Sequence, residues 1–148
     1  MRASVEDWGF RARSLAVARG MVRASVITFV LSLTACADET ISGYADPDAT
    51  YRLVELGGEP FPARATIRFP EEGRLEGDAP CNRWFAKQNV PYPWFEAGSI
   101  GATKRGCADL ALETAFFEAL GAMTLVEVQG PVLILSDDDG RSMVFQVE

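Results

Sequence analysis

The stretch "GRLEGDAPCNRWFA", residues 73–86, decides the fold of this 148-residue chain. Its two ends predict β-strands over 74–77 and 83–87, and a cysteine and an asparagine lie between them. On its N-terminal side, residues 64–69 alternate polar and apolar side chains, which is typical of a half-buried strand. Residues 51–56 show a similar pattern. These segments predict a mostly β domain.

Toward the C-terminus the sequence predicts a hairpin. Two apolar runs, "VLILS" and "RSMVFQV", flank residues 137–140, which end in Asp-Gly. An Asp-Gly pair between two apolar runs is a strong hairpin signal. A calcium loop is the alternative, but such a loop places its acidic residues on alternate positions. The three aspartates here are consecutive, so we expect a turn.

Residues 109–120 form the predicted helix. Asp109 is the expected N-cap and Gly121 the expected C-terminal stop. Glu113 and Glu118 lie outside the apolar stripe of this helix. The stripe follows the spacing i, i+3, i+4, i+7 and i+8, which predicts that the helix packs on the sheet; it comprises Leu112, Ala115, Phe116, Ala119 and Leu120.

The N-terminal segment, residues 1–35, has the pattern of an export signal. An apolar run over 24–33 follows Arg11, Arg13, Arg19 and Arg23, and small residues come after it. A basic region, a short apolar region and small residues before a cleavage site are typical of a secretory signal. The uncharged stretch is too short to span a bilayer, which needs about 20 apolar residues. Met21 is an alternative start that would give a shorter signal.

The signal ends in Leu33-Thr34-Ala35-Cys36, which resembles the lipobox of bacterial lipoproteins. In that family the cysteine thiol receives diacylglycerol and the peptide is cut just before it, so Cys36 is the expected lipid attachment point. Several acyl chains make a lasting membrane anchor where one does not. Residues 36–49 are expected to form a flexible acidic tether. Because Ala37 follows the cysteine, we expect the periplasmic face of the outer membrane.

Charge and cysteine number constrain partners and cofactors. The 35 signal residues contain five of the 14 basic and two of the 21 acidic residues, which leaves a mature net charge of −10. This balance argues against nucleic acid and anionic lipid head groups as partners. With Cys36 lipidated, Cys81 and Cys107 remain as an expected disulfide in an oxidising compartment. A zinc site is the alternative, but the chain has no histidine, and neither a metal nor a cofactor is expected.

Several motifs together resemble the META-domain family, which includes HslJ-type heat-shock proteins. They are "YRLVELGGEPF", "GRLEGDAPCNRWFA", "GATKRGC", the predicted helix and "LILSDDDGRSMVF", in that order over residues 50–148. The most specific part is Asn82 and Arg83 after Cys81, with Thr103 four residues before Cys107. The resemblance implies an α+β fold, in which a mostly antiparallel, curved, barrel-like sheet packs against one helix. It implies no reaction.

The residues themselves favour binding over catalysis. Without histidine there is no Ser-His-Asp or Cys-His system, and Glu76 and Asp78 are expected on a solvated face. We expect a non-enzymatic envelope lipoprotein, an interaction or stress-related module that contacts other envelope proteins. The alternative is a carrier that encloses a small apolar ligand or an acyl chain. In "PYPWF", residues 91–95, Trp94 and Phe95 form a candidate contact surface, or else they fill the core.

Overall fold

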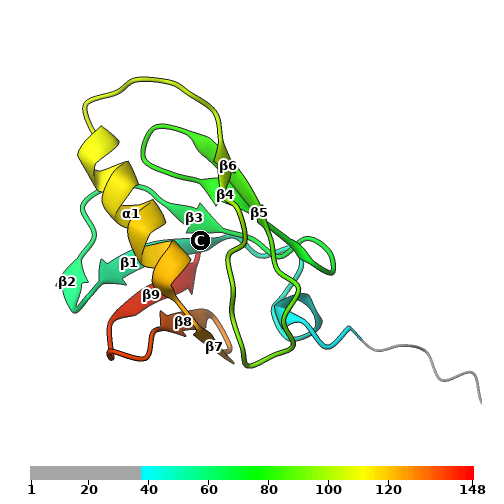
Figure 1. The fold of residues 1–148 in the computed structure, drawn as a ribbon. Coiled ribbons are helices and arrows are strands. Elements are labelled where there is room, and N and C mark those ends of the chain that lie inside the picture. Colours follow the sequence, from blue (N-terminus) through cyan, green and yellow to red (C-terminus); the bar gives the residue numbers. More distant parts are fainter. Residues whose placement is uncertain (1–37) are drawn as a thin grey trace, which may run out of the picture. The chain divides into compact units, whose positions relative to one another are not determined.

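Two antiparallel sheets and one α-helix make up the part of the chain that the computed structural model describes, residues 38–148 (Figure 1). The strands are β1 (Tyr51–Leu56), β2 (Glu59–Pro60), β3 (Thr66–Ile67), β4 (Arg74–Asp78), β5 (Arg83–Lys87), β6 (Gly101–Ala102), β7 (Leu125–Gln129), β8 (Val132–Ser136) and β9 (Ser142–Val147). The helical elements are the short 3₁₀ helix η1 (Ile41–Gly43) and α1 (Leu110–Ala122). None of the helices within these residues is long and apolar enough to cross a bilayer.

The larger sheet has the order β2-β1-β9-β8-β7, with β3 also paired to β1, and the smaller has the order β4-β5-β6. An isolated bridge between Arg68, just after β3, and Glu76 of β4 connects them, and a second bridge joins Trp94, in the loop between β5 and β6, to Leu125 of β7. The sheets therefore curve around a shared core, as Figure 1 shows, without closing into a barrel. The expected α+β class with a curved antiparallel sheet and one helix is confirmed.

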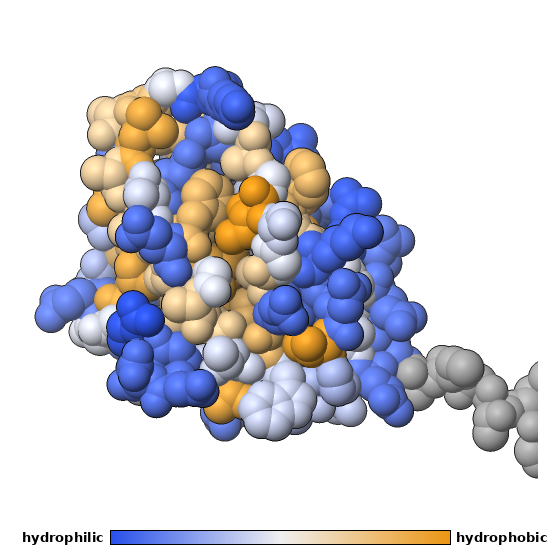
Figure 2. All heavy atoms as spheres, in the orientation of Figure 1, coloured by the Kyte–Doolittle hydropathy of each residue, from blue (hydrophilic) through white to orange (hydrophobic). Residues whose placement is uncertain are grey.

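Alternating side chains build the core. In β5 the side chains of Trp84 and Ala86 are buried, whereas Arg83, Phe85 and Lys87 are exposed, because successive strand residues point to opposite faces. Helix α1 contributes Phe116 and Leu120, and the ring of Phe116 lies edge-on to Trp84. Figure 2 shows hydrophobic residues over α1 and toward the middle of this face, with hydrophilic ones around them.

Several elements differ from the sequence predictions. Helix α1 continues through Gly121, which is exposed, and ends before Met123, which has an extended backbone. Within 64–69 only Thr66–Ile67 forms a strand. Strand β7 was not among the predicted strands, and it pairs with β8 through a tight turn at Gly130. The predicted hairpin between β8 and β9 is present.

Residues 38–49 pack against the domain, although their composition predicts part of a flexible tether. The side chain of Ile41 in η1 is buried in the core, and Ala45 and Ala49 are buried beside it. The backbone N–H of Tyr92 donates to the carbonyl oxygen of Glu39 at 2.7 Å. The ordered unit therefore begins at least as early as residue 38 rather than at residue 50.

Candidate functional site

The residues that carry the family resemblance form a buried polar cluster, which we call the Asn82 cluster: Asn82, Thr103 and Glu113. Asn82 Oδ1 accepts hydrogen bonds from Thr103 Oγ1 at 2.8 Å and from the backbone N–H of Arg105 at 2.7 Å. Asn82 Nδ2 donates to Glu113 Oε1 at 2.7 Å and to the carbonyl oxygen of Arg105 at 3.1 Å. These contacts use every donor and acceptor site of the amide, so Asn82 has a structural role.

Glu113 completes the cluster from helix α1. Its Oε2 accepts the backbone N–H of Cys81 at 2.9 Å, and the side chain is buried. Burial of a carboxylate is tolerated when hydrogen bonds satisfy it. The expected disulfide between Cys81 and Cys107 is present beside this cluster, with a Cα–Cα distance of 5.7 Å. Together they join the start of β5, the 103–107 loop and α1.

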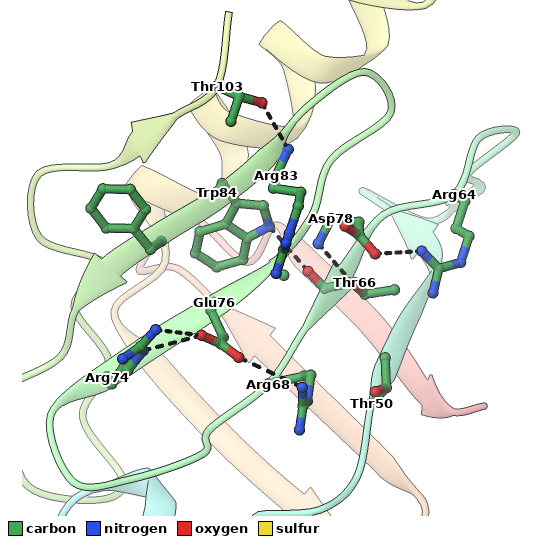
Figure 3. A pocket seen from close by; sticks show the side chains of 12 residues that line it. Thr50, Arg64, Thr66, Arg68, Arg74, Glu76, Asp78, Arg83, Trp84 and Thr103 are labelled. Atoms are coloured by element: carbon green, nitrogen blue, oxygen red, sulfur yellow. Dashed lines mark hydrogen bonds and ion pairs between the residues drawn. The ribbon is translucent and has the colours of Figure 1, made fainter. Parts of the chain in front are cut away.

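The Asn82 cluster also positions Arg83. Thr103 Oγ1 accepts the backbone N–H of Arg83 at 3.2 Å, and the N–H of Thr103 donates to the carbonyl oxygen of Arg83 at 3.0 Å. Only the main chain of Arg83 takes part in these bonds. Its side chain is therefore left to point outward, into a groove next to the cluster (Figure 3).

This groove, which we call the arginine groove, has a volume of about 350 Å³ and is the candidate functional site. It lies over the outward faces of β3, β4 and β5. Of the nine basic residues after Cys36, four line it. A local basic site therefore exists on an otherwise acidic domain. The lining residues are Thr50, Arg64, Thr66, Arg68, Arg74, Glu76, Gly77, Asp78, Arg83, Trp84, Phe85 and Thr103.

Two of these arginines have strong carboxylate partners. Arg64 forms ion pairs with Asp78 at 2.7 Å and with Glu148 at 2.9 Å. Its hydrogen bonds to Glu148 and then to Asp78 raise the pKa of Arg64 above its ordinary value. Arg74 pairs with Glu76 at 2.8 Å, and the hydrogen bonds to Glu76 raise the pKa of Arg74. Both guanidinium groups stay charged and occupied.

The other two arginines are held less tightly by carboxylates. Glu76 lies between Arg74 and Arg68 (Figure 3), and its contact to Arg68 Nη1 is longer, at 3.6 Å. The buried Nε of Arg68 has no hydrogen-bond partner within the described residues. Among residues 38–148, no carboxylate forms an ion pair with Arg83. A guanidinium group presents several donors in a planar fork that matches a carboxylate.

An aromatic side chain borders the charged part of the groove. Phe85 is 61 % exposed. Its ring covers Gly101 of β6 so closely that a Cβ there would lie 2.6 Å from the ring. Gly101 thus allows the ring to rest on the sheet beside Arg83. The groove combines free guanidinium donors with an apolar surface, which suits recognition of a ligand with both acidic and apolar groups.

The sequence indicated some of these residues and missed others. Arg83 and Thr103 are part of the site, whereas Arg64, Arg68 and Arg74 were not singled out. The sequence pattern could have indicated these three arginines, because each lies in or beside a predicted strand at an outward-facing position. Glu76 and Asp78 lie on the outward face as expected, but they are paired with arginines there.

The segment "PYPWF" divides between surface and core. Trp94 is 56 % exposed, whereas Phe95 is buried. Phe95 therefore cannot belong to a contact surface, and that part of the prediction is wrong. The alternative in which both fill the core is wrong for Trp94. Cys36, the expected lipid attachment point, lies outside the described residues. Within residues 38–148, no group of three or more His, Cys, Asp or Glu side chains could hold a metal ion.

Comparison with known proteins identifies the class of protein that this fold and cluster define. The chain belongs to the META domain family, whose model matches residues 45–148. This confirms the resemblance seen in the sequence. No curated protein matches the chain significantly.

Solved structures share the fold at low sequence identity. A protein from Burkholderia xenovorans, solved by NMR, is 19 % identical with a TM-score of 0.56 over 73 % of this chain and 86 % of that chain. A DUF4847 family protein from Bacteroides vulgatus is 14 % identical with a TM-score of 0.52, over 75 % of this chain and 94 % of that chain. These similarities show the fold alone.

Proposed function

We propose that this META domain is a membrane-anchored recognition module that binds an acidic segment of another envelope protein in the arginine groove. The observation that carries the proposal is that one groove holds two weakly held guanidinium groups: Arg83 has no ion-pair partner among residues 38–148, and Arg68 has only a long contact to Glu76, at 3.6 Å. Hydrogen bonds between a guanidinium and a carboxylate are about twice as strong as neutral ones. Arginines outnumber acidic residues in the lining of the groove, so it favours an acidic segment.

The lipid anchor at Cys36 is part of this proposal. It is supported by the lipobox pattern over residues 33–36 and the basic and apolar segments before it. An anchored domain meets its partners at the membrane surface, where a high effective concentration makes weak contacts useful. A groove of modest area is then sufficient for a regulated contact in the cell envelope.

The groove favours ligand binding over catalysis because its carboxylates are already paired with arginines. Asp78 and Glu76 each contact a guanidinium group, at 2.7 and 2.8 Å. A general acid or base needs a free path to its substrate, whereas these two groups are occupied in holding the arginines. The charged walls also suit an acidic segment better than an acyl chain, which a carrier would enclose in apolar surroundings.

Photo-crosslinking in intact cells tests the proposal. A photoreactive phenylalanine analogue replaces Phe85 at the groove, and the matched control places it at Arg52, which is exposed on β1. We expect a discrete protein adduct from position 85 that is absent from position 52. The adduct should be lost when Arg68 and Arg83 are both replaced by Ala. An adduct that survives the loss of both arginines would contradict binding through the groove.

A further inference from the structure

A second exposed feature lies where the chain enters the domain. Three aromatic residues, Tyr44, Tyr92 and Trp94, come from two segments joined by the hydrogen bond from Tyr92 N–H to the carbonyl oxygen of Glu39, and we call them the aromatic surface. Tyr44 is 55 % and Trp94 56 % exposed. The rings of Tyr44 and Tyr92 stack with centroids 4.1 Å apart. Tyr92 and Trp94 belong to one turn, in which the N–H of Trp94 donates to the carbonyl oxygen of Pro91 at 2.9 Å.

The chain is fixed to the domain immediately before this surface. Asp38 accepts hydrogen bonds from Thr40 Oγ1 at 2.7 Å and from Ser42 Oγ at 2.6 Å. Burial alone would raise the pKa of Asp38, but these hydrogen bonds outweigh it and lower the pKa below its ordinary value. Ile41 anchors the same segment in the core. The position of Asp38 is therefore set by the domain.

Chain length then limits how far the domain can lie from a lipid at Cys36. A single residue separates Cys36 from Asp38. Two residue steps reach at most about 7 Å even when fully extended, which is about the thickness of one head-group layer. A domain with this connection cannot swing freely away from the bilayer. The part of its surface next to Asp38 must face the lipid.

We propose that the aromatic surface is a membrane-contacting face, on which Tyr44, Tyr92 and Trp94 lie among the lipid head groups beside Cys36. The inference rests on the proposed lipid anchor. Trp and Tyr are enriched at membrane–water interfaces, because their rings are apolar at one end and polar at the other. The contact would orient the domain on the membrane.

The charged residues near the aromatic surface indicate which lipid head groups it can contact. Glu39, Asp46 and Asp48 are exposed acidic residues in the same segment. Acidic residues are repelled by the negative surface of anionic lipids, so zwitterionic head groups are the chemistry that fits. The aromatic surface shares no residue with the arginine groove, and both can therefore be occupied at once.

Tryptophan fluorescence of the lipidated protein in phosphatidylcholine vesicles tests this inference. After removal of the signal, two tryptophans remain, Trp84 at 2 % and Trp94 at 56 % exposure. The Trp94→Phe variant supplies the Trp84 background. We expect vesicle-bound Trp94 to emit at shorter wavelength and to lose most of its quenching by acrylamide, compared with the unlipidated Cys36→Ser protein produced without residues 1–35. Replacing half of the lipid with phosphatidylglycerol should reduce this shielding.

A matched control moves the reporter to the groove. In the double variant Phe85→Trp/Trp94→Phe, the new tryptophan should remain open to acrylamide on the same vesicles. Flotation separates the two proposals. A protein that does not float with vesicles overturns both the anchor and the membrane face. A protein that floats while Trp94 stays as accessible as in Cys36→Ser overturns the membrane face alone.

Discussion

Replacing Glu113 with Ala removes the acceptor of two buried donors at once. The backbone N–H of Cys81, 2.9 Å from Oε2, and one N–H of Asn82, 2.7 Å from Oε1, both lose their partner. Neither donor can turn to solvent, because Cys81 and Asn82 are themselves buried. The substitution therefore tests whether the Asn82 cluster holds helix α1 to the start of β5.

The expected decrease in the free energy of unfolding follows from the loss of these two hydrogen bonds. A hydrogen bond to a charged group contributes about 1.5–3 kcal/mol, and a buried donor left alone costs a similar amount. The higher helix propensity of alanine offsets a few tenths of a kcal/mol of this destabilisation. The free energy of unfolding should thus fall by about 3–5 kcal/mol, a large share of the roughly 5–15 kcal/mol typical of a domain.

Equilibrium urea unfolding measures this loss through the fluorescence of buried Trp84, which packs on α1. Glu113→Gln keeps one acceptor oxygen but presents an amide donor to the other N–H, so it should lose about half as much. Glu118→Ala, at an exposed position of the same helix, is the matched control. A loss for Glu113→Ala no larger than that for Glu118→Ala would refute the reasoning.

Three further predictions concern stability. Reducing the disulfide, which closes a loop with a sequence separation of 26, should lower the free energy of unfolding by about 3.5 kcal/mol on the chain-entropy estimate; unchanged urea midpoints would contradict it. Burial alone would raise the pKa of Asp137, but hydrogen bonds and the charge of Arg141 outweigh it and lower the pKa. Its stabilisation is therefore complete above the unfolded pKa of about 3.9 and is lost as pH falls through the lower folded value. Acid titration of unfolding should show this loss in the wild type and not in Asp137→Asn. Finally, Trp94→Ala should leave the melting temperature nearly unchanged, whereas Phe95→Ala should cost about 3–5 kcal/mol, and equal losses would argue against the assigned exposures.

Local patterns predicted most of the strands. In β5 the alternation from Arg83 to Lys87 is complete within five residues, so the sequence alone determines which face is buried. Strand β7 was missed although it also contains apolar residues. Its place in the sheet depends on pairing with β8 and on the bridge between Leu125 and Trp94, which no local pattern records.

Glu113 shows why the polar cluster could not be predicted. On a helical projection its carboxylate falls outside the apolar stripe, which indicates solvent. Its partners, Cys81 and Asn82, lie 32 and 31 residues away in sequence. Only the tertiary fold brings their N–H groups to the helix, and only those groups make burial of the carboxylate favourable.

The arginine groove and the packing of the N-terminal segment could not be predicted either, because both depend on tertiary contacts. Arg83 faces Asp78 across β4 and β5, and Arg68 reaches Glu76 through an isolated bridge. Strand pairing therefore assembles the groove from residues that are unremarkable one at a time. In the segment before β1, the acidic composition predicted flexibility, but the apolar side chains of Ile41, Ala45 and Ala49 reach the core and fix the segment there.

Binding of a labelled hexaglutamate peptide to the purified lipidated protein tests the central claim most directly. Fluorescence anisotropy in detergent micelles at about 0.15 M salt, where charges more than about 8 Å apart are screened, compares the wild type with two variants. We expect the double variant Arg68→Ala/Arg83→Ala to bind at least about tenfold more weakly, which corresponds to 1.4 kcal/mol, and Arg52→Ala to bind like the wild type. Equal affinity of the wild type and the double variant would contradict recognition through the arginine groove.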